Sequence, residues 1–96
     1  MSDLEITANG DQVSLRGRIN YDTVNQALAA NIFQNSSSLN VDFSAVGHAD
    51  SSALALMVHW LRESRQKNVQ ITFSHIPKKL VALAEMSSLR EVLPLA

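Results

Sequence analysis

The amino-acid sequence predicts an α/β fold in which three or more α-helices pack mainly on one face of a four-stranded mixed β-sheet. Segments in which apolar and polar residues alternate predict strands, and longer segments in which apolar residues recur every three or four positions predict helices. The segments follow one another as strand, strand, helix, strand, helix, strand, helix. Because every predicted strand alternates, we expect one face of the sheet to be covered and the other to be wetter.

Length and composition predict a single domain over residues 1–96, with 46% hydrophobic and 18% charged residues. A net charge of −1 gives no basis for nucleic-acid binding, and the absence of cysteine excludes disulfides and thiolate metal sites. The longest apolar-rich run, residues 53–61, is far shorter than the roughly 20 residues that span a bilayer. The acidic, alternating start does not resemble a secretory signal. We therefore expect a soluble cytoplasmic protein without direct membrane insertion.

The first two strands, residues 4–8 and 13–19, are expected to form an antiparallel hairpin. Asn9-Gly10-Asp11 between them supplies residues that accept a positive φ angle in a tight turn. Gly17 in the second strand leaves room for the close approach of a neighbouring segment. Asn20 and Asp22 are competing N-cap candidates for the helix that follows. Its apolar stripe is expected to consist of Val24, Ala27, Leu28 and Ile32.

The third strand and the next helix carry the polar side chains of greatest functional interest. Residues 39–43 alternate as in a half-buried strand, and from Leu54 onward the spacing becomes that of a helix. We expect the change near Gly47, at a turn, and Asp50 as the N-cap of a helix that runs to about Lys67. A carboxylate is therefore predicted at the helix start, directly before two hydroxyls.

A fourth strand and a third helix complete the predicted fold. Residues 69–73 alternate, and Pro77 suits the first turn of a helix. The strand–helix–strand connections between positions 13 and 73 are expected to be right-handed crossovers between parallel neighbours. The apolar face of the third helix and the patch after it are expected to be formed by Leu80, Leu83, Ala84 and Ser87, and then by Leu89, Val92 and Leu93.

The central helix has more apolar surface than one face against a sheet requires. At about 100° per residue, the apolar residues of this helix form two stripes, and the first of them, which begins at Leu54, is expected to pack on the sheet. Leu56 and Trp60 fall on an adjoining flank, which is either buried by a neighbouring helix or offered to a partner. The residues of the first stripe are Leu54, Met57, Val58 and Leu61.

The two serines at the start of this helix are expected to differ in exposure. Ser51 turns toward the flank near the sheet edge, whereas Ser52 lies on the outward side with His59 and Glu63. We therefore expect Ser52 to be the more accessible hydroxyl. The alternative to a functional role is that both serines only occupy favourable first-turn positions after the cap at Asp50.

The residues around the start of this helix favour neither catalysis nor metal binding. A hydrolase could be drawn from His48, Asp50, Ser51, Ser52 and His59, but there is no Gly-x-Ser-x-Gly elbow and no oxyanion site beyond the helix amides. The spacing of the histidines, including His75, matches no zinc signature, and three scattered glycines cannot form a phosphate-binding loop. We expect no enzymatic activity, no metal and no cofactor.

Three segments resemble the STAS domains of bacterial anti-sigma factor antagonists. These are residues 15–20, residues 41–44 and the Asp50-Ser51-Ser52-Ala53-Leu54 motif, and the resemblance covers nearly the entire chain. In those antagonists the motif is Asp-Ser-Ser-Gly-Leu, and its second serine, which falls on Ser52, is phosphorylated by a partner anti-sigma kinase. This chain departs from the pattern at Ala53, where the family usually has glycine.

Further segments resemble the MlaB family, the STAS-domain subunits of ABC transporters that move phospholipid between the two membranes of Gram-negative bacteria. They are residues 54–61, 69–73 and 83–89. The resemblance implies a cytoplasmic accessory subunit that binds and supports the transporter ATPase, lies at the inner membrane through that partner, and helps to maintain outer-membrane lipid asymmetry. It also implies that the hydroxyl directly after the motif aspartate, here Ser51, matters for the contact.

Two functions therefore remain open: an ABC transporter subunit, and an anti-sigma factor antagonist controlled by phosphorylation at Ser52 or Ser51. Both place a protein-binding surface at the start of the central helix, where a hydroxyl can hydrogen-bond across an interface and apolar side chains can serve as anchors. The predicted partner-binding residues are Asp50, Ser51, Ser52, Leu56, His59 and Trp60.

Overall fold

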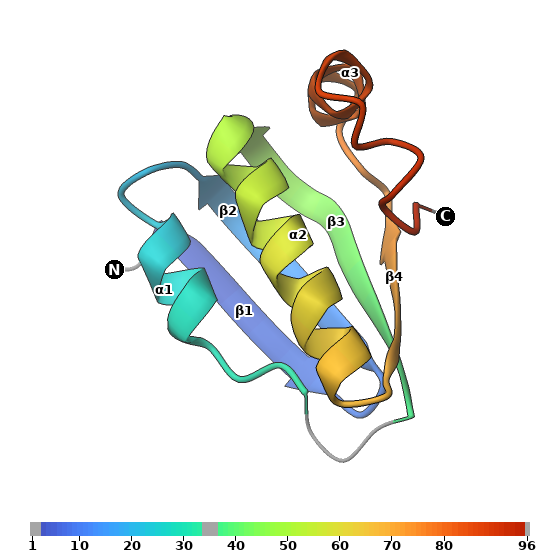
Figure 1. Cartoon of the computed structure of the whole chain (residues 1–96). Helices are drawn as coiled ribbons and strands as arrows, with labels where there is room; N and C mark the ends of the chain where they lie inside the picture. Colours follow the sequence, from blue (N-terminus) through green and yellow to red (C-terminus); the bar gives the residue numbers. More distant parts are fainter. Residues whose placement is uncertain (1–2, 34–36, 96) are drawn as a thin grey trace.

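The computed structural model describes residues 3–33 and 37–95, and its elements occur in the predicted order (Figure 1). The helices α1 and α2 lie across one face of the sheet, and α3 lies at the end of the sheet where α2 begins. The predicted mixed sheet with helices mainly on one face is thereby confirmed. The elements are β1 (Leu4–Asn9), β2 (Gln12–Ile19), α1 (Val24–Ala29), β3 (Ser38–Ala49), α2 (Ser51–Gln66), β4 (Gln70–Ser74) and α3 (Lys78–Met86).

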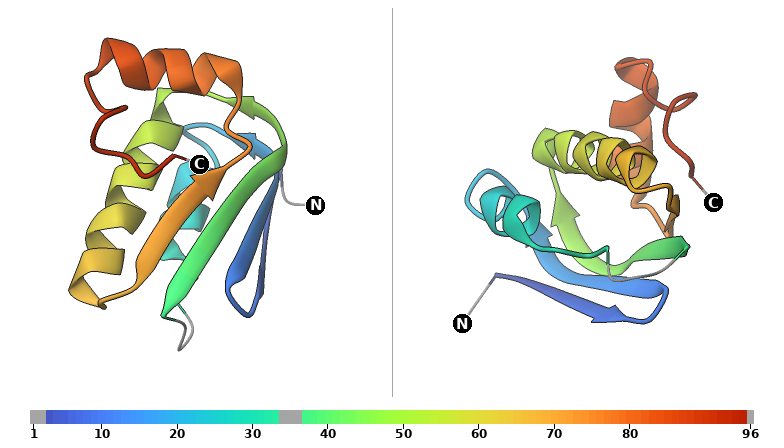
Figure 2. Two further views of the ribbon diagram at one scale, coloured as in Figure 1. Left: turned by 90° about the vertical axis from the view of Figure 1, so that its right-hand side faces the viewer. Right: turned by 60° about the horizontal axis from the view of Figure 1, so that its bottom comes forward.

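The four strands lie in the order β1-β2-β3-β4. β1 and β2 form the predicted antiparallel hairpin, with Leu4 opposite Gly17 and Asn9 opposite Gln12. β2 pairs in parallel with β3, and β3 in parallel with β4, so the expectation of parallel neighbours is also confirmed. Because the strands of a parallel sheet end together, the carboxyl ends of β2 and β3 lie at the same edge as the start of α2 (Figure 2).

The core fills the space between the sheet and the helices. Its largest fully buried side chains are Trp60, Phe43 and Phe73, and the rings of Phe43 and Phe73 meet edge to face with centroids 6.1 Å apart. Burying a phenylalanine side chain stabilises a fold by roughly 1.5–3 kcal/mol. The opposite face of the sheet is polar, as predicted: the Asn40 amide donates to Gln12 Oε1 and to Ser74 Oγ, both at 3.0 Å.

Gly17 meets the expectation of a close approach. Its φ angle is +110°, and a Cβ atom at this position would lie 2.1 Å from the carbonyl oxygen of Asp3. The next amide, of Arg18, donates to that same carbonyl at 2.9 Å. Both the left-handed backbone and the contact with the start of β1 therefore require glycine.

β3 is longer than predicted and passes straight through Gly47. The expected turn near Gly47 is wrong, because residues 46–49 continue to pair with β2. The pairing shifts register twice along β2, and after Phe43 the buried positions of β3 are Val46 and Ala49, three residues apart instead of two. A register shift breaks the two-residue period of a strand. The sequence pattern at this point therefore looked like the end of a strand.

The first helix begins later than predicted and ends earlier: its N-cap is Thr23, not Asn20 or Asp22, and the Thr23 side chain makes no capping hydrogen bond. Asn20 instead closes the turn before the helix, where its Oδ1 accepts from the amides of Asp22 at 2.9 Å and Thr23 at 3.1 Å. The predicted stripe is wrong at its end, because α1 stops at Ala29. Leu28 is 36% exposed, and Ile32 is buried but lies beyond the helix.

The carboxyl-terminal part follows the prediction except at two positions. Pro77 directly precedes α3, and Leu80, Ala84 and Leu93 are buried. Ser87 lies beyond the helix and is exposed, and Val92 is 50% exposed, so both expectations of apolar contact are wrong. Across the part of the chain that the structure describes, no helix is both long and apolar enough to cross a membrane.

Candidate partner-binding site

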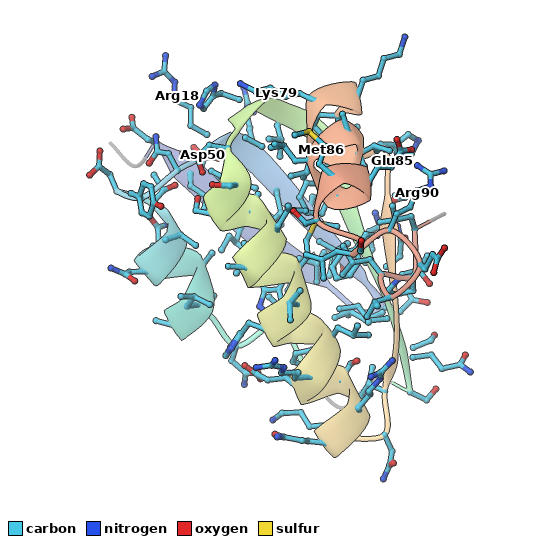
Figure 3. The ribbon with its side chains drawn as sticks, turned by 45° about the horizontal axis from the view of Figure 1, so that its top comes forward. Arg18, Asp50, Lys79, Glu85, Met86 and Arg90 are labelled. Atoms are coloured by element: carbon cyan, nitrogen blue, oxygen red, sulfur yellow. The ribbon has the colours of Figure 1, made fainter. Side chains whose placement is uncertain are left out.

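The start of α2 is held at the end of the sheet by backbone contacts. The amide of Asp50 donates to the carbonyl oxygen of Ile19, the last residue of β2, at 3.1 Å. Figure 3 shows Asp50 between Arg18 on β2 and Lys79 on α3. The predicted motif therefore lies where three elements meet.

Asp50 caps α2, as predicted. Its Oδ1 accepts from the amide of Ser52 at 2.8 Å and from the Ser52 hydroxyl at 2.5 Å. The hydrogen bond from the Ser52 hydroxyl is the largest cause that lowers the pKa of Asp50. Partial burial opposes it, whereas the Ser52 amide and the nearby His48 and Lys79 act in the same direction as the hydroxyl. The carboxylate therefore stays ionised at neutral pH and complements the positive end of the helix dipole.

The two serines differ in the opposite sense from the prediction. Ser52 is 7% exposed and its hydroxyl is bonded to Asp50, whereas Ser51 is exposed. The expectation that Ser52 is the more accessible hydroxyl is wrong. Ser52 lies one helical turn before Leu56, and because that flank of α2 is buried, Ser52 is buried with it.

Leu56 and Trp60 belong to the core. Both are fully buried, on a helix that packs against α1 and α3. Of the two alternatives for this flank, burial holds, and the prediction that these side chains serve as apolar anchors for a partner is wrong. The indole Nε1 of Trp60 has no hydrogen-bond partner among the described residues.

The exposed surface of α2 is instead a stripe that we call the outer stripe, made of Ser51, Ala55, His59 and Arg62. Ser51, Ala55 and Arg62 are exposed, and the His59 side chain is 40% exposed with Nε2 beside Glu63 Oε1. Ala55 was absent from the predicted site. The helical spacing would have identified it once Leu56 was assigned to the core, because Ala55 lies four residues after Ser51.

Two further exposed groups near this site were not predicted. Met86, on the helix α3 that packs against α2, is 82% exposed (Figure 3). Lys79 lies close enough to Asp50 for its charge to lower the pKa of that carboxyl group. Neither residue has a sequence signal of its own, because both depend on where α3 lies relative to the start of α2.

The structure does not bring together the serine, histidine and aspartate side chains from which a hydrolase site could be drawn. Among the described residues, neither Ser51 nor Ser52 hydrogen-bonds to a histidine, and the hydroxyl of Ser52 donates to Asp50. His75 lies on the polar face of the sheet, where its Nδ1 is 2.9 Å from Asp42 Oδ1. Within residues 3–33 and 37–95, no three histidine or acidic side chains cluster as metal ligands would.

Comparisons with known proteins agree with this fold. The family model described as "Mlab, STAS domain" matches residues 2–94. A search of curated proteins finds no match. One chain of the Acinetobacter MlaFEDB complex, solved in its ATP-bound Vtrans2 conformation, is 27% identical with a TM-score of 0.75, over 96% of this chain and 99% of that chain.

Two solved anti-sigma factor antagonists share the fold at lower identity. Unphosphorylated SpoIIAA is 19% identical with a TM-score of 0.72, over 97% of this chain and 87% of its own. An antagonist from Mycobacterium paratuberculosis is 20% identical with a TM-score of 0.67, over 96% and 82%. At these identities the likeness establishes the common fold alone.

Proposed function

Because this chain belongs to the STAS family whose model is described as "Mlab, STAS domain", we propose that it is a non-enzymatic accessory subunit of an ABC phospholipid transporter. It binds the ATPase subunit on the cytoplasmic side, supports its activity in maintaining outer-membrane lipid asymmetry, and lies at the inner membrane only through that partner. The observation that carries this proposal is the likeness to one chain of the MlaFEDB complex, which this chain matches over nearly its whole length.

The outer stripe of α2 is the contact surface in this proposal. Ser51 presents a hydroxyl at the first turn, and Ala55, one turn later, is small enough to let a partner surface approach the helix backbone closely. His59 adds a polar group one turn after Ala55. Asp50 contributes indirectly, because its cap fixes the direction in which Ser51 points.

The second candidate is an anti-sigma factor antagonist, and the observation in its favour is the Asp50-Ser51-Ser52 order at a helix start. The state of Ser52 bears on this alternative. A phosphate on Ser52 would replace the hydroxyl proton that bonds to Asp50 and would place about two negative charges beside that carboxylate. Ser51 could take a phosphate without breaking the cap.

An affinity pull-down tests the choice between these functions. Tagged wild-type chain is expected to recover an ABC ATPase with its permease from solubilised membranes, and Ser51→Glu to lose them. Ser38→Glu is the matched control, since Ser38 is an exposed serine at the opposite end of β3. Recovery of a small kinase instead, with phosphate on Ser51 or Ser52, would contradict the transporter proposal and support the antagonist.

A further inference from the structure

The outer edge of β4 is partly covered by the end of the chain. β4 pairs with β3 on one side, and on the other side the amide of Phe73 donates to the carbonyl oxygen of Pro94 at 3.0 Å. Phe73 and Leu95 form an isolated parallel bridge at this point. The protein itself therefore shows that the carboxyl-terminal half of this edge pairs with an extended segment at one bridge.

The pairing stops short of the first half of β4. The amide of Gln70 donates to the carbonyl of Ser37, so the peptide groups of Gln70 face β3. Because successive residues of a strand direct their peptide groups to opposite sides, those of Ile71 face outward, as the amide of Phe73 does. Among the described residues, no backbone group pairs with Ile71 on this outer side.

A cavity of about 340 Å³ lies beside this open edge, between the second half of α2, β4 and the chain after α3. Figure 2 shows this side of the molecule, with the end of the chain meeting β4 near its carboxyl end. Leu61 and Ile71 are almost completely buried, whereas Val92 is half exposed. The lining includes Leu61, Ser64, Arg65, Ile71, Val92 and Pro94.

Of the polar side chains that line the cavity, Ser64 is hydrogen-bonded and Arg65 has no ion-pair partner among the described residues. The hydroxyl of Ser64 donates to the carbonyl of Leu61 at 2.7 Å and is buried. Arg65 is exposed and forms no ion pair within the described part of the chain. The groove therefore combines open backbone hydrogen-bonding groups, one unpaired cation and a mixed lining, in which Gln70 and Thr72 add polar side chains to the apolar ones.

We propose that this groove binds an extended segment of a protein partner, which pairs with β4 at Ile71 as an added strand and directs an acidic side chain to Arg65. Strand addition suits an exposed sheet edge because the backbone supplies the hydrogen bonds and alternate side chains fill neighbouring pockets. A lipid chain could fill the apolar part of the lining but could not pair with the peptide groups of Ile71. This surface is separate from the outer stripe, so the proposal stands independently of the proposed function.

A peptide titration followed by NMR tests the proposal. The probe is a short peptide of alternating valine and threonine that ends in aspartate, added to millimolar concentration. We expect amide shifts concentrated at Ile71, Phe73 and Arg65. Arg65→Glu should weaken binding about fivefold, as expected for loss of one exposed ion pair. A peptide ending in lysine should bind Arg65→Glu more tightly than it binds the wild type.

Arg16→Glu is the matched control, because Arg16 is an exposed arginine on β2 that does not line the groove. It should leave the affinity unchanged. The absence of shifts at millimolar peptide, shifts confined to another surface, or equal weakening by Arg16→Glu and Arg65→Glu would each overturn the proposal. The same shifts on raising the concentration of the chain without peptide would also overturn it, since the occupant would then be a second copy.

Discussion

Two stripes lie side by side on α2, and neighbouring residues in the sequence have opposite environments. Ser52 and Trp60 lie on a stripe that is buried, whereas Ser51 and Ala55 lie on one that is exposed. In the sequence, nothing distinguishes Ser51 from Ser52, and Ala55 and Trp60 are both apolar residues of the same helix. The comparison shows that a rotation of one residue, about 100° around the helix, decides whether a side chain of this motif stabilises the fold or is free to contact a partner.

The largest effect should come from the buried stripe. Trp60→Ala removes a fully buried indole and should lower the free energy of unfolding by about 3–5 kcal/mol. Arg62→Ala, two positions later on the exposed side, should change it by less than about 0.5 kcal/mol. Urea denaturation measures both, with Trp60→Phe as a milder variant if Trp60→Ala does not fold. Equal losses at positions 60 and 62 would contradict the assignment of the stripes.

The next effect compares the two serines directly. Ser52→Glu places a carboxylate at a buried position beside Asp50 and removes a hydroxyl hydrogen bond, so it should destabilise the protein by about 1–3 kcal/mol. Ser51→Glu puts the same charge at an exposed first-turn position, where the helix dipole favours it by up to about 1 kcal/mol. Thermal denaturation of both variants provides the comparison. A larger loss of stability for Ser51→Glu than for Ser52→Glu would contradict the assignment of Ser52 as the buried serine.

A smaller effect is expected from the charge of the cap. The pKa of Asp50 is lowered in the folded state from its ordinary value of 3.8, so its carboxylate stabilises the protein above that pH, and the contribution is lost as the pH falls through the folded pKa. Asp50→Asn keeps a capping oxygen but not the charge, and should cost about 0.3–1 kcal/mol at neutral pH. The difference from wild type should shrink below pH 3.8. A difference independent of pH would show that the charge does not contribute.

Local signals in the sequence were sufficient for the elements and for the cap. The alternation of residues 4–8 and 13–19 with the turn between them predicted the hairpin, and Asp50 before an apolar helix predicted its N-cap. These features depend on residues close together in the chain. They could therefore be deduced without knowing where the other elements lie.

The errors arose where distant segments decide the environment. The continuation of β3 past Gly47 depends on shifts of register against β2, which alter the spacing of buried residues from Phe43 to Ala49. The burial of Ser52 and Trp60 depends on α1 and α3, which pack against α2. No local pattern reports on either contact, so the helix could be predicted but its exposed face could not.

The most direct test of the account is the affinity of the chain for its proposed ATPase partner after a change at Ala55 alone. Ala55→Arg adds a bulky side chain to the middle of the outer stripe, at an exposed position where the fold should tolerate it. Calorimetric titration with the recovered ATPase should show binding weakened at least about tenfold, the equivalent of ~1.4 kcal/mol, with an unchanged melting temperature. An unchanged affinity would show that the exposed stripe of α2 is not the surface that binds the ATPase.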